Sequence, residues 1–335
     1  MPITTIGDMS QHFQSVRNTG LIKSRLSELS QELSTGQVSD IGKHLMGDTS
    51  DLIGLNHEIS LLEIYGSTND ETARTLEAMQ LNLQRVDATR ANAAASLLTV
   101  NADSNRSETM NAAVTGKNAF ADTVGAFNAS SSGRRIFSGT LVDQAPLLDH
   151  EAMLSEIVTA VGGASEKESI VAAIDSWFDT VGGGFETVGY LGGHVHQSRK
   201  LDAESSTEID VRADDTGVKD LLKGLAYAAV ASEMSSSLTD RTFGELVNES
   251  GVKLIGAAVG LSDLQGRLGQ KEEAVAVASS SNSAQLSSYQ IARSDLIKAD
   301  PFETATRLQE IQTQLETHFA VTARLSNLNL VDFLR

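Results

Sequence analysis

The 335 residues contain only three prolines, at positions 2, 146 and 301. Because a proline inside a helix removes a backbone hydrogen bond and clashes with the preceding turn, this scarcity permits very long uninterrupted helices. Aromatic residues make up only 4% of the chain, which predicts an aliphatic, alanine-rich core of the kind found in helix bundles. The sequence therefore favours a mainly α fold, in which long antiparallel helices form a rod.

The last stretch of the chain, 306–335, has the pattern of an amphipathic helix. Its start is signalled by Asp300 as N-cap, by Pro301 at the first helical position and by Glu303, which would complete a capping box. Apolar side chains at helical spacing then share one face: Leu308, Ile311, Leu315, Leu325 and Leu328. A terminal helix frays unless another element covers its apolar face, so this stretch requires a partner.

The beginning of the chain has a matching pattern between Gly20 and Gly36, LIKSRLSELSQELSTG. Its apolar residues follow at steps of four, three and four, the spacing of a coiled-coil seam: Ile22, Leu26, Leu29 and Leu33. Gly36 is placed as the residue that ends the helix. Because about five turns of isolated helix are marginal in water, we expect the two terminal helices to pair antiparallel. The alternative is that each helix folds back on a nearby core helix.

We name these nine leucines and isoleucines of the two ends the assembly seam, and expect it to make contacts in an assembly. Residues 1–54 and 299–335 are accordingly interpreted as a terminal coiled-coil assembly domain. Residues 55–142 and 216–298 repeat apolar side chains at helical spacing and are expected to form the antiparallel rod. The first of these helices is expected to continue to about residue 130.

Residues 143–215 lack the long helical pattern of the rod and are interpreted as a small α+β domain inserted into it. Helices are expected over 151–161 and 167–181, the second beginning at a capping box of Ser165 and Glu168. Ile209 and Val211 alternate with charged neighbours, which indicates a half-exposed strand. Just before this segment, RRIFSGT (134–140) is expected to form a strand or a hairpin arm.

Three segments resemble the flagellin-type axial proteins of the bacterial flagellum, the flagellin/FlgL family. They are ELSTG at 32–36, RRIFSGT, and QLETHFAVTARLSNLNLVDFLR at the C-terminus. The opening MPITTIGDMSQHF is more similar to the hook–filament junction branch of this family than to filament flagellin. After ELSTG this chain reads QVSDIGKHLMGDTSDL and departs from the basic-hydrophobic pair and double-Asp motif usual in the family.

Charge narrows the classes of partner. The formal net charge is −18, which argues against binding to nucleic acid and to anionic membranes. Residues 143–215 hold fifteen acids against four bases, a net −11, so we expect the insert to face water. Without cysteine, the chain has no thiol catalysis, disulfide or zinc–thiolate site. The first thirty residues lack the pattern of a signal peptide, and no apolar run approaches the ~20 residues of a membrane span.

No constellation of residues suggests an enzyme or a cofactor site. His194 and His196 could supply two metal ligands, but the sequence fixes no acidic neighbour, and surface histidines are the simpler interpretation. His57-Glu58 and His150-Glu151 begin like a zinc-protease motif, but a leucine stands where each second histidine would be. We therefore expect no catalytic, cofactor-binding or metal site.

The resemblance implies a structural function: joining hook to filament by self-assembly through the terminal helices. It also implies export through the flagellar channel without a cleaved signal, and a place outside the cell at the hook–filament junction. The implied partners are other copies of the chain, a neighbouring hook-associated protein, flagellin and an export chaperone. The alternatives are a filament flagellin and, from another class, a cytoplasmic coiled-coil signalling protein, which should lack an α+β insert.

Overall fold

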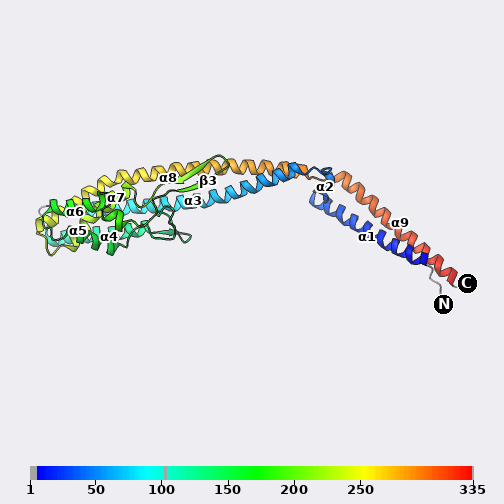
Figure 1. Ribbon diagram of the computed structural model, residues 1–335, viewed down its shortest axis with the longest axis horizontal. Coiled ribbons are helices and arrows are strands. Elements are labelled where there is room, and N and C mark those ends of the chain that lie inside the picture. Colours follow the sequence, from blue (N-terminus) through cyan, green and yellow to red (C-terminus); the bar gives the residue numbers. More distant parts are fainter. Residues whose placement is uncertain (1–5, 102–103, 334–335) are drawn as a thin grey trace. The chain divides into compact units, whose positions relative to one another are not determined.

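The computed structural model describes the backbone of residues 6–101 and 104–333, and within these ranges all side chains except those of 6–8, 11, 12 and 325–333. It divides into two compact units. Unit 1 comprises Met1–Glu63 and Ala284–Arg335, and unit 2 comprises Ile64–Ser283. Two long helices, α3 (Ser50–Leu97) and α8 (Asp240–Leu296), contribute residues to both units. The predicted mainly α fold is confirmed (Figure 1).

Unit 1 is built around the terminal helices α1 (Ile6–Thr35) and α9 (Pro301–Phe333), with the short α2 (Ile41–His44) between α1 and α3. Gly36 ends α1 as predicted: its φ is +69° and its amide donates to the carbonyl of Glu32 at 2.8 Å. Asp300 caps α9, since its carboxylate accepts from the amides of Phe302 and Glu303 at 2.8 and 3.1 Å. The side chain of Glu303 pairs with Arg307, so no complete capping box is seen.

Unit 2 contains the remaining elements in chain order. After α3 come α4 (Arg106–Phe127), the hairpin β1 (Ser130–Ser131) and β2 (Arg134–Arg135), α5 (His150–Val161), α6 (Lys167–Asp179) and a π-helical turn (Phe185–Gly189). A second antiparallel pair, β3 (Gln197–Lys200) and β4 (Ser206–Ile209), precedes α7 (Thr216–Glu233). The hairpin includes only the first two residues of RRIFSGT, which form its second arm. β4 alternates exposed and buried residues and includes Ile209 as predicted, whereas Val211 lies after the strand.

The prediction of one helix running from residue 55 to about residue 130 is wrong. α3 ends at Leu97, and α4 begins only after Asn105. Asn105 and Glu108 form a complete capping box, with the Asn105 side chain accepting from the Glu108 amide at 2.9 Å. The break is legible in the sequence, because residues 99–105 are mostly weak helix formers and Asn105 and Glu108 have the spacing of a capping box.

The core of unit 2 surrounds α7, where most side chains are fully buried. Helices α4, α5 and α6 all pack against α7. The apolar residues of α5 and α6, among them Ile157, Ile174 and Phe178, join the same buried cluster as those of α3 and α8. Residues 143–215 have the predicted mixture of helices and strands, but no core separate from that of the long helices. The predicted capping box at Ser165 is not formed, because α6 has Glu166 as its N-cap residue, without a side-chain bond.

Two glycines let α7 and α8 approach closely. A Cβ on Gly260 would lie 2.8 Å from the Cα of Gly217, which is backbone and cannot turn away. We expect Gly260→Ala to destabilise the chain by about 1–3 kcal/mol, the usual cost of overpacking a tight contact. Gly256→Ala, on the same helix but facing open space, should instead stabilise it by about 0.5–1 kcal/mol. Chemical denaturation of the two variants measures both; equal effects would contradict the close approach.

Candidate functional site

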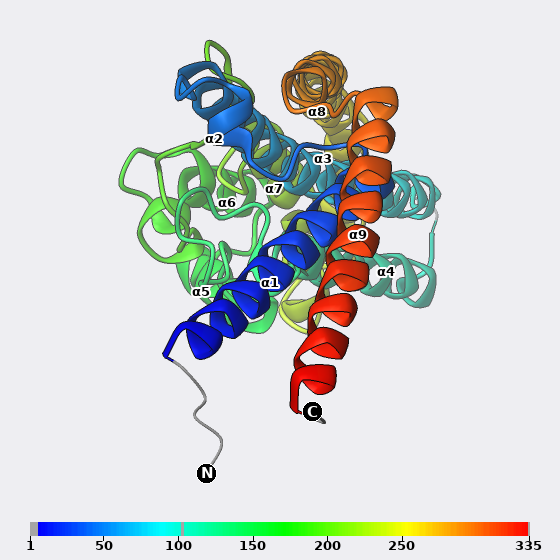
Figure 2. The ribbon, with the colours of Figure 1, turned by 90° about the vertical axis from the view of Figure 1, so that its right-hand side faces the viewer.

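The terminal helices α1 and α9 lie side by side in unit 1 and run in opposite directions (Figure 2). Near the middle of α1, Thr19 Oγ1 lies 3.4 Å from Nδ1 of His318. At one end of the pair, just after α1 and just before α9, the carbonyl of Gly36 accepts from the amide of Ala299 at 2.9 Å. Partners early in α1 are thus late in α9, which establishes the antiparallel pairing.

The pairing brings the two halves of the assembly seam together but covers them unevenly. Ile22 is buried, whereas Leu26, Leu29, Leu308, Ile311 and Leu315 are half-buried. Leu33 is 42% exposed. The side chains of Leu325 and Leu328 lie outside the described residues. A two-helix contact cannot enclose its own apolar side chains, so half-buried leucines are what such a pair leaves.

The outer side of the helix pair carries further apolar side chains. Met9 and Val16, seven residues apart and therefore on one face of α1, are each more than half exposed. Gly20 continues this face with open space beside it. On α9, Phe302 is 83% exposed. The sequence analysis missed this second face; the spacing of seven between Met9 and Val16 was the available signal.

Ion pairs are distributed unequally between the units. Among the described side chains, the ion pair within unit 1 is Arg307–Glu303. Cations of unit 2 are mostly paired within their own unit, as in Lys223–Asp179 at 2.7 Å. Unit 1 therefore presents charged groups, such as Arg25 and Lys298, without ion-pair partners in the described part of the chain.

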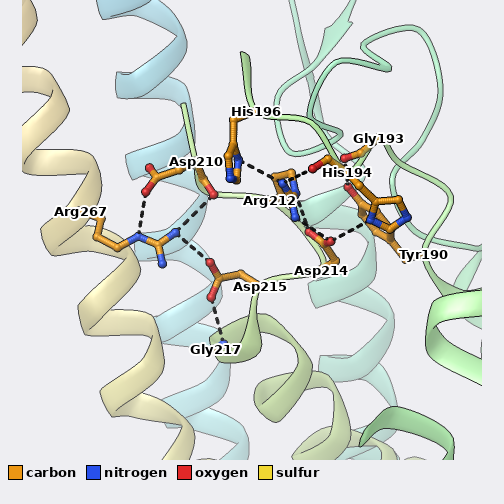
Figure 3. A network of polar contacts seen from close by, with 10 residues as sticks. All are labelled: Tyr190, Gly193, His194, His196, Asp210, Arg212, Asp214, Asp215, Gly217 and Arg267. Carbon is orange, nitrogen blue, oxygen red and sulfur yellow. Dashed lines mark hydrogen bonds and ion pairs between the residues drawn. The ribbon is translucent and has the colours of Figure 1, made fainter. Parts of the chain in front are cut away.

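The histidines considered as metal ligands lie in a polar network in unit 2 (Figure 3). At its centre the guanidinium of Arg212 binds Asp214 through two hydrogen bonds of 2.8 and 2.9 Å. Arg212 also donates to the carbonyl of His194 at 2.8 Å and lies 3.1 Å from Nδ1 of His196. A fixed positive charge between two imidazoles disfavours a metal ion. No group of three metal-ligating side chains occurs among the described residues.

Tyr190 anchors one side of this network. Its hydroxyl donates to the carbonyl of Gly193 at 2.8 Å, and its ring lies 5.4 Å from that of His194. Burial, and to a smaller extent the negative charge of Asp214, raise the pKa of Tyr190 to about 12. The phenol therefore stays protonated and holds this hydrogen bond at any physiological pH.

Arg267 of α8 forms the other half of the network. It donates to Asp215 at 2.8 Å and lies 3.5 Å from the carboxylate of Asp210 (Figure 3). Asp215 in turn caps α7 by accepting from the amide of Gly217. These contacts join the end of β4 and the start of α7 to α8, so the network positions these three elements.

The C-terminal part of the chain is similar to a known protein family. Residues 252–334 match the bacterial flagellin C-terminal helical region. Two solved structures align with most of this chain at 14% identity. A flagellar hook-associated protein of Vibrio parahaemolyticus aligns over 73% of this chain and 95% of its own (TM-score 0.45), and FlgL of Bacillus cereus over 72% and 100% (TM-score 0.42). The sequence has no match among curated proteins.

The fold is mainly α, and the two terminal helices of unit 1 are paired. Residues 252–334 carry the bacterial flagellin C-terminal helical region, which supports the predicted resemblance of the C-terminal segment to flagellin-type proteins. Within the described residues, none of the helices combines the length and apolar character that crossing a membrane requires.

Proposed function

We propose that this chain joins the hook to the filament of the bacterial flagellum and enters that assembly through its terminal helices. The observation that carries the proposal is the α1–α9 pair, which includes part of the matched flagellin region. The pair leaves apolar side chains uncovered on both its seam and its outer side. Removing one such side chain from water stabilises an assembly by about 1.5–3 kcal/mol if burial is complete.

The charges of unit 1 support the same proposal. Cations without a partner in their own unit can pair with acids of a neighbouring subunit. Such pairs also determine the orientation in which the two subunits bind. The proposed neighbours are other copies of this chain, a hook-associated protein on one side and flagellin on the other. The proposed route is export through the flagellar channel, with a chaperone covering the apolar termini before assembly.

Two alternatives differ from this proposal in specific ways. A filament flagellin would share the terminal helices and differ in position; the opening segment MPITTIGDMSQHF favours the junction. A cytoplasmic coiled-coil signalling protein would have long helices without mixed structure between them. The π-helical turn and the two strands between α6 and α7 disfavour that alternative.

Labelling of flagella locates the protein and tests the proposal. Because the chain has no cysteine, Val181→Cys creates a single attachment point at a site that is 89% exposed. A thiol-reactive gold label on intact flagella is expected to mark one narrow band where the hook ends. Cells carrying the cysteine-free chain are the control. Labelling along the whole filament would favour the flagellin alternative, and labelling confined to the cell interior would overturn the proposal.

A further inference from the structure

Two asparagines lie on the core-facing sides of the long helices of unit 2. On α3, Asn69 lies seven residues before the buried Leu76, and on α8, Asn282 lies seven residues after the buried Val275. Seven residues are about two helical turns, so each asparagine continues the buried side of its helix. Asn69 is 0% exposed and Asn282 is 3% exposed. We name their two side chains the carboxamide pair.

The carboxamide pair binds a single backbone group, the carbonyl of Leu201. Leu201 is buried and directly follows β3, in the connection to β4 beside the long helices (Figure 1). The Nδ2 atoms of Asn69 and Asn282 donate to its oxygen at 3.1 and 2.8 Å. A carbonyl oxygen has two lone pairs, so these two donors use its full capacity. The tip of the β3–β4 hairpin is thereby bound to both α3 and α8.

The same contact determines which way each carboxamide points. Turning either one over would place its Oδ1 against the Leu201 oxygen, and two acceptors repel each other. In the observed orientation, Oδ1 of Asn69 and Oδ1 of Asn282 are both buried and accept no hydrogen bond from the described part of the chain. Folded proteins rarely leave buried polar atoms unpaired, so these two oxygens require a partner from outside the chain.

The charges around the carboxamide pair disfavour an ion as that partner. Amide oxygens are acceptors and would repel an anion. Arg199 precedes Leu201 by two residues, on the same side of the extended chain, and brings a positive charge. Its acid partner Glu71 is shared with Arg134, so a net positive charge remains and disfavours a cation. These groups favour a neutral molecule that donates hydrogen bonds.

A water molecule has this chemistry. It carries two O–H donors, one for each Oδ1, and buried waters typically make about three hydrogen bonds. A third can come from Nε of Arg199, a buried donor that has no acceptor within the described residues. Apolar side chains further along the two helices, such as Leu76 and Val275, offer no polar partner, and apolar interiors stay dry.

We propose that the carboxamide pair binds one buried water molecule, which bridges Asn69 of α3 and Asn282 of α8 beside the hairpin tip. The two side chains hold the water through their oxygens and the Leu201 carbonyl through their nitrogens. The site lies within unit 2 and does not depend on the assembly proposed for the terminal helices.

Such a site fixes the register of α3 against α8. Apolar side chains can repack when one helix slides along the other by a turn. The carboxamide pair, by contrast, shares its partners only while Asn69 stands beside Asn282. A single polar residue in an apolar helix seam specifies register in this way in coiled coils.

A crystal structure of the full chain, at a resolution that shows ordered water, tests the site without any substitution. We expect a density peak about 2.8 Å from Oδ1 of both asparagines, the distance of a hydrogen bond from water. A peak at about 2.4 Å, surrounded by further oxygen ligands, would identify a cation and overturn the proposal. The absence of any peak between the two oxygens would also overturn it.

Magnetic relaxation of the solvent, which counts long-lived bound waters, tests the carboxamide pair in solution. Asn69→Leu combined with Asn282→Leu removes both Oδ1 atoms and should lose about one such water relative to the unchanged chain. The matched control is Asn82→Leu, because Asn82 also lies on α3 but donates to the carbonyl of Ala78 in its own helix at 2.8 Å. An unchanged count in the double variant, or an equal loss in the control, contradicts the proposal. The crystallographic test decides the question even if the double variant fails to fold.

Discussion

Deleting residues 143–215 and closing the gap with a short Gly/Ser bridge is expected to unfold unit 2. The deletion removes α5 and α6, whose buried side chains pack on α4 and α7: Met153, Ile157, Ile170, Ile174 and Phe178. At about 1.5–3 kcal/mol for each buried apolar side chain, the loss is as large as the ~5–15 kcal/mol stability of a typical domain. Thermal unfolding followed by circular dichroism should show that the cooperative transition of unit 2 is lost.

The control for this deletion removes charge without removing core. Glu151→Gln with Glu156→Gln changes two exposed carboxylates of α5 and should leave the unfolding transition within about 0.5 kcal/mol of its original position, as surface substitutions usually do. If the deleted chain still unfolds cooperatively with its remaining helices intact, then residues 143–215 are dispensable for folding and this prediction is wrong.

Replacing Ile22 with aspartate is expected to separate α1 from α9. Ile22 is 8% exposed, and its removal forfeits about 1.5–3 kcal/mol of burial. A carboxylate at this position must remain hydrated, which adds to the free-energy cost of keeping the two helices paired. Because isolated helices of this length are only marginally stable, the pair should then open. A pair of cysteines at Thr19 and His318, which lie in contact, reports the pairing through its rate of disulfide formation.

The matched control is Leu21→Asp, one residue earlier on α1, where the side chain is 56% exposed. We expect Ile22→Asp to slow the 19–318 disulfide by about tenfold or more, a change of 1.4 kcal/mol, and Leu21→Asp to leave it nearly unchanged. Unit 2 should unfold as in the original chain in both variants. Equal rates in the two variants would show that Ile22 does not hold the pair together.

The local signals of the helix ends were predictable from the sequence where one residue acts alone. Gly36 takes a left-handed conformation, which glycine adopts without strain, and Asp300 caps α9 with its own carboxylate. The reciprocal half of a capping box depends on competition. Glu303 has Arg307 one turn away and pairs with it, and spacing alone does not rank those two partners.

The packing between segments that are far apart in the sequence was harder to predict. The helices of residues 143–215 were predictable, but periodicity does not reveal which partner covers an apolar face, so the packing of α5 and α6 on α7 was not predicted. The network around Arg212 and Arg267 likewise joins residues that are far apart in the sequence, such as Arg267 and Asp210. The pairing of α1 with α9 was predictable because both helices carry apolar side chains at helical spacing, whereas the role of the seam in assembly stays a prediction.

We propose that the α1–α9 pair is the surface by which the chain enters the flagellum. The most direct measurement compares Leu315→Asp with Gln314→Asp in a strain that lacks this protein and is non-motile. Leu315 is a half-buried seam residue, whereas Gln314 is exposed beside it, so the two variants differ in position and little in chemistry. We predict that Leu315→Asp leaves hooks without attached filaments and Gln314→Asp restores them. Filaments attached equally in both strains, with both proteins exported and folded, would contradict the account.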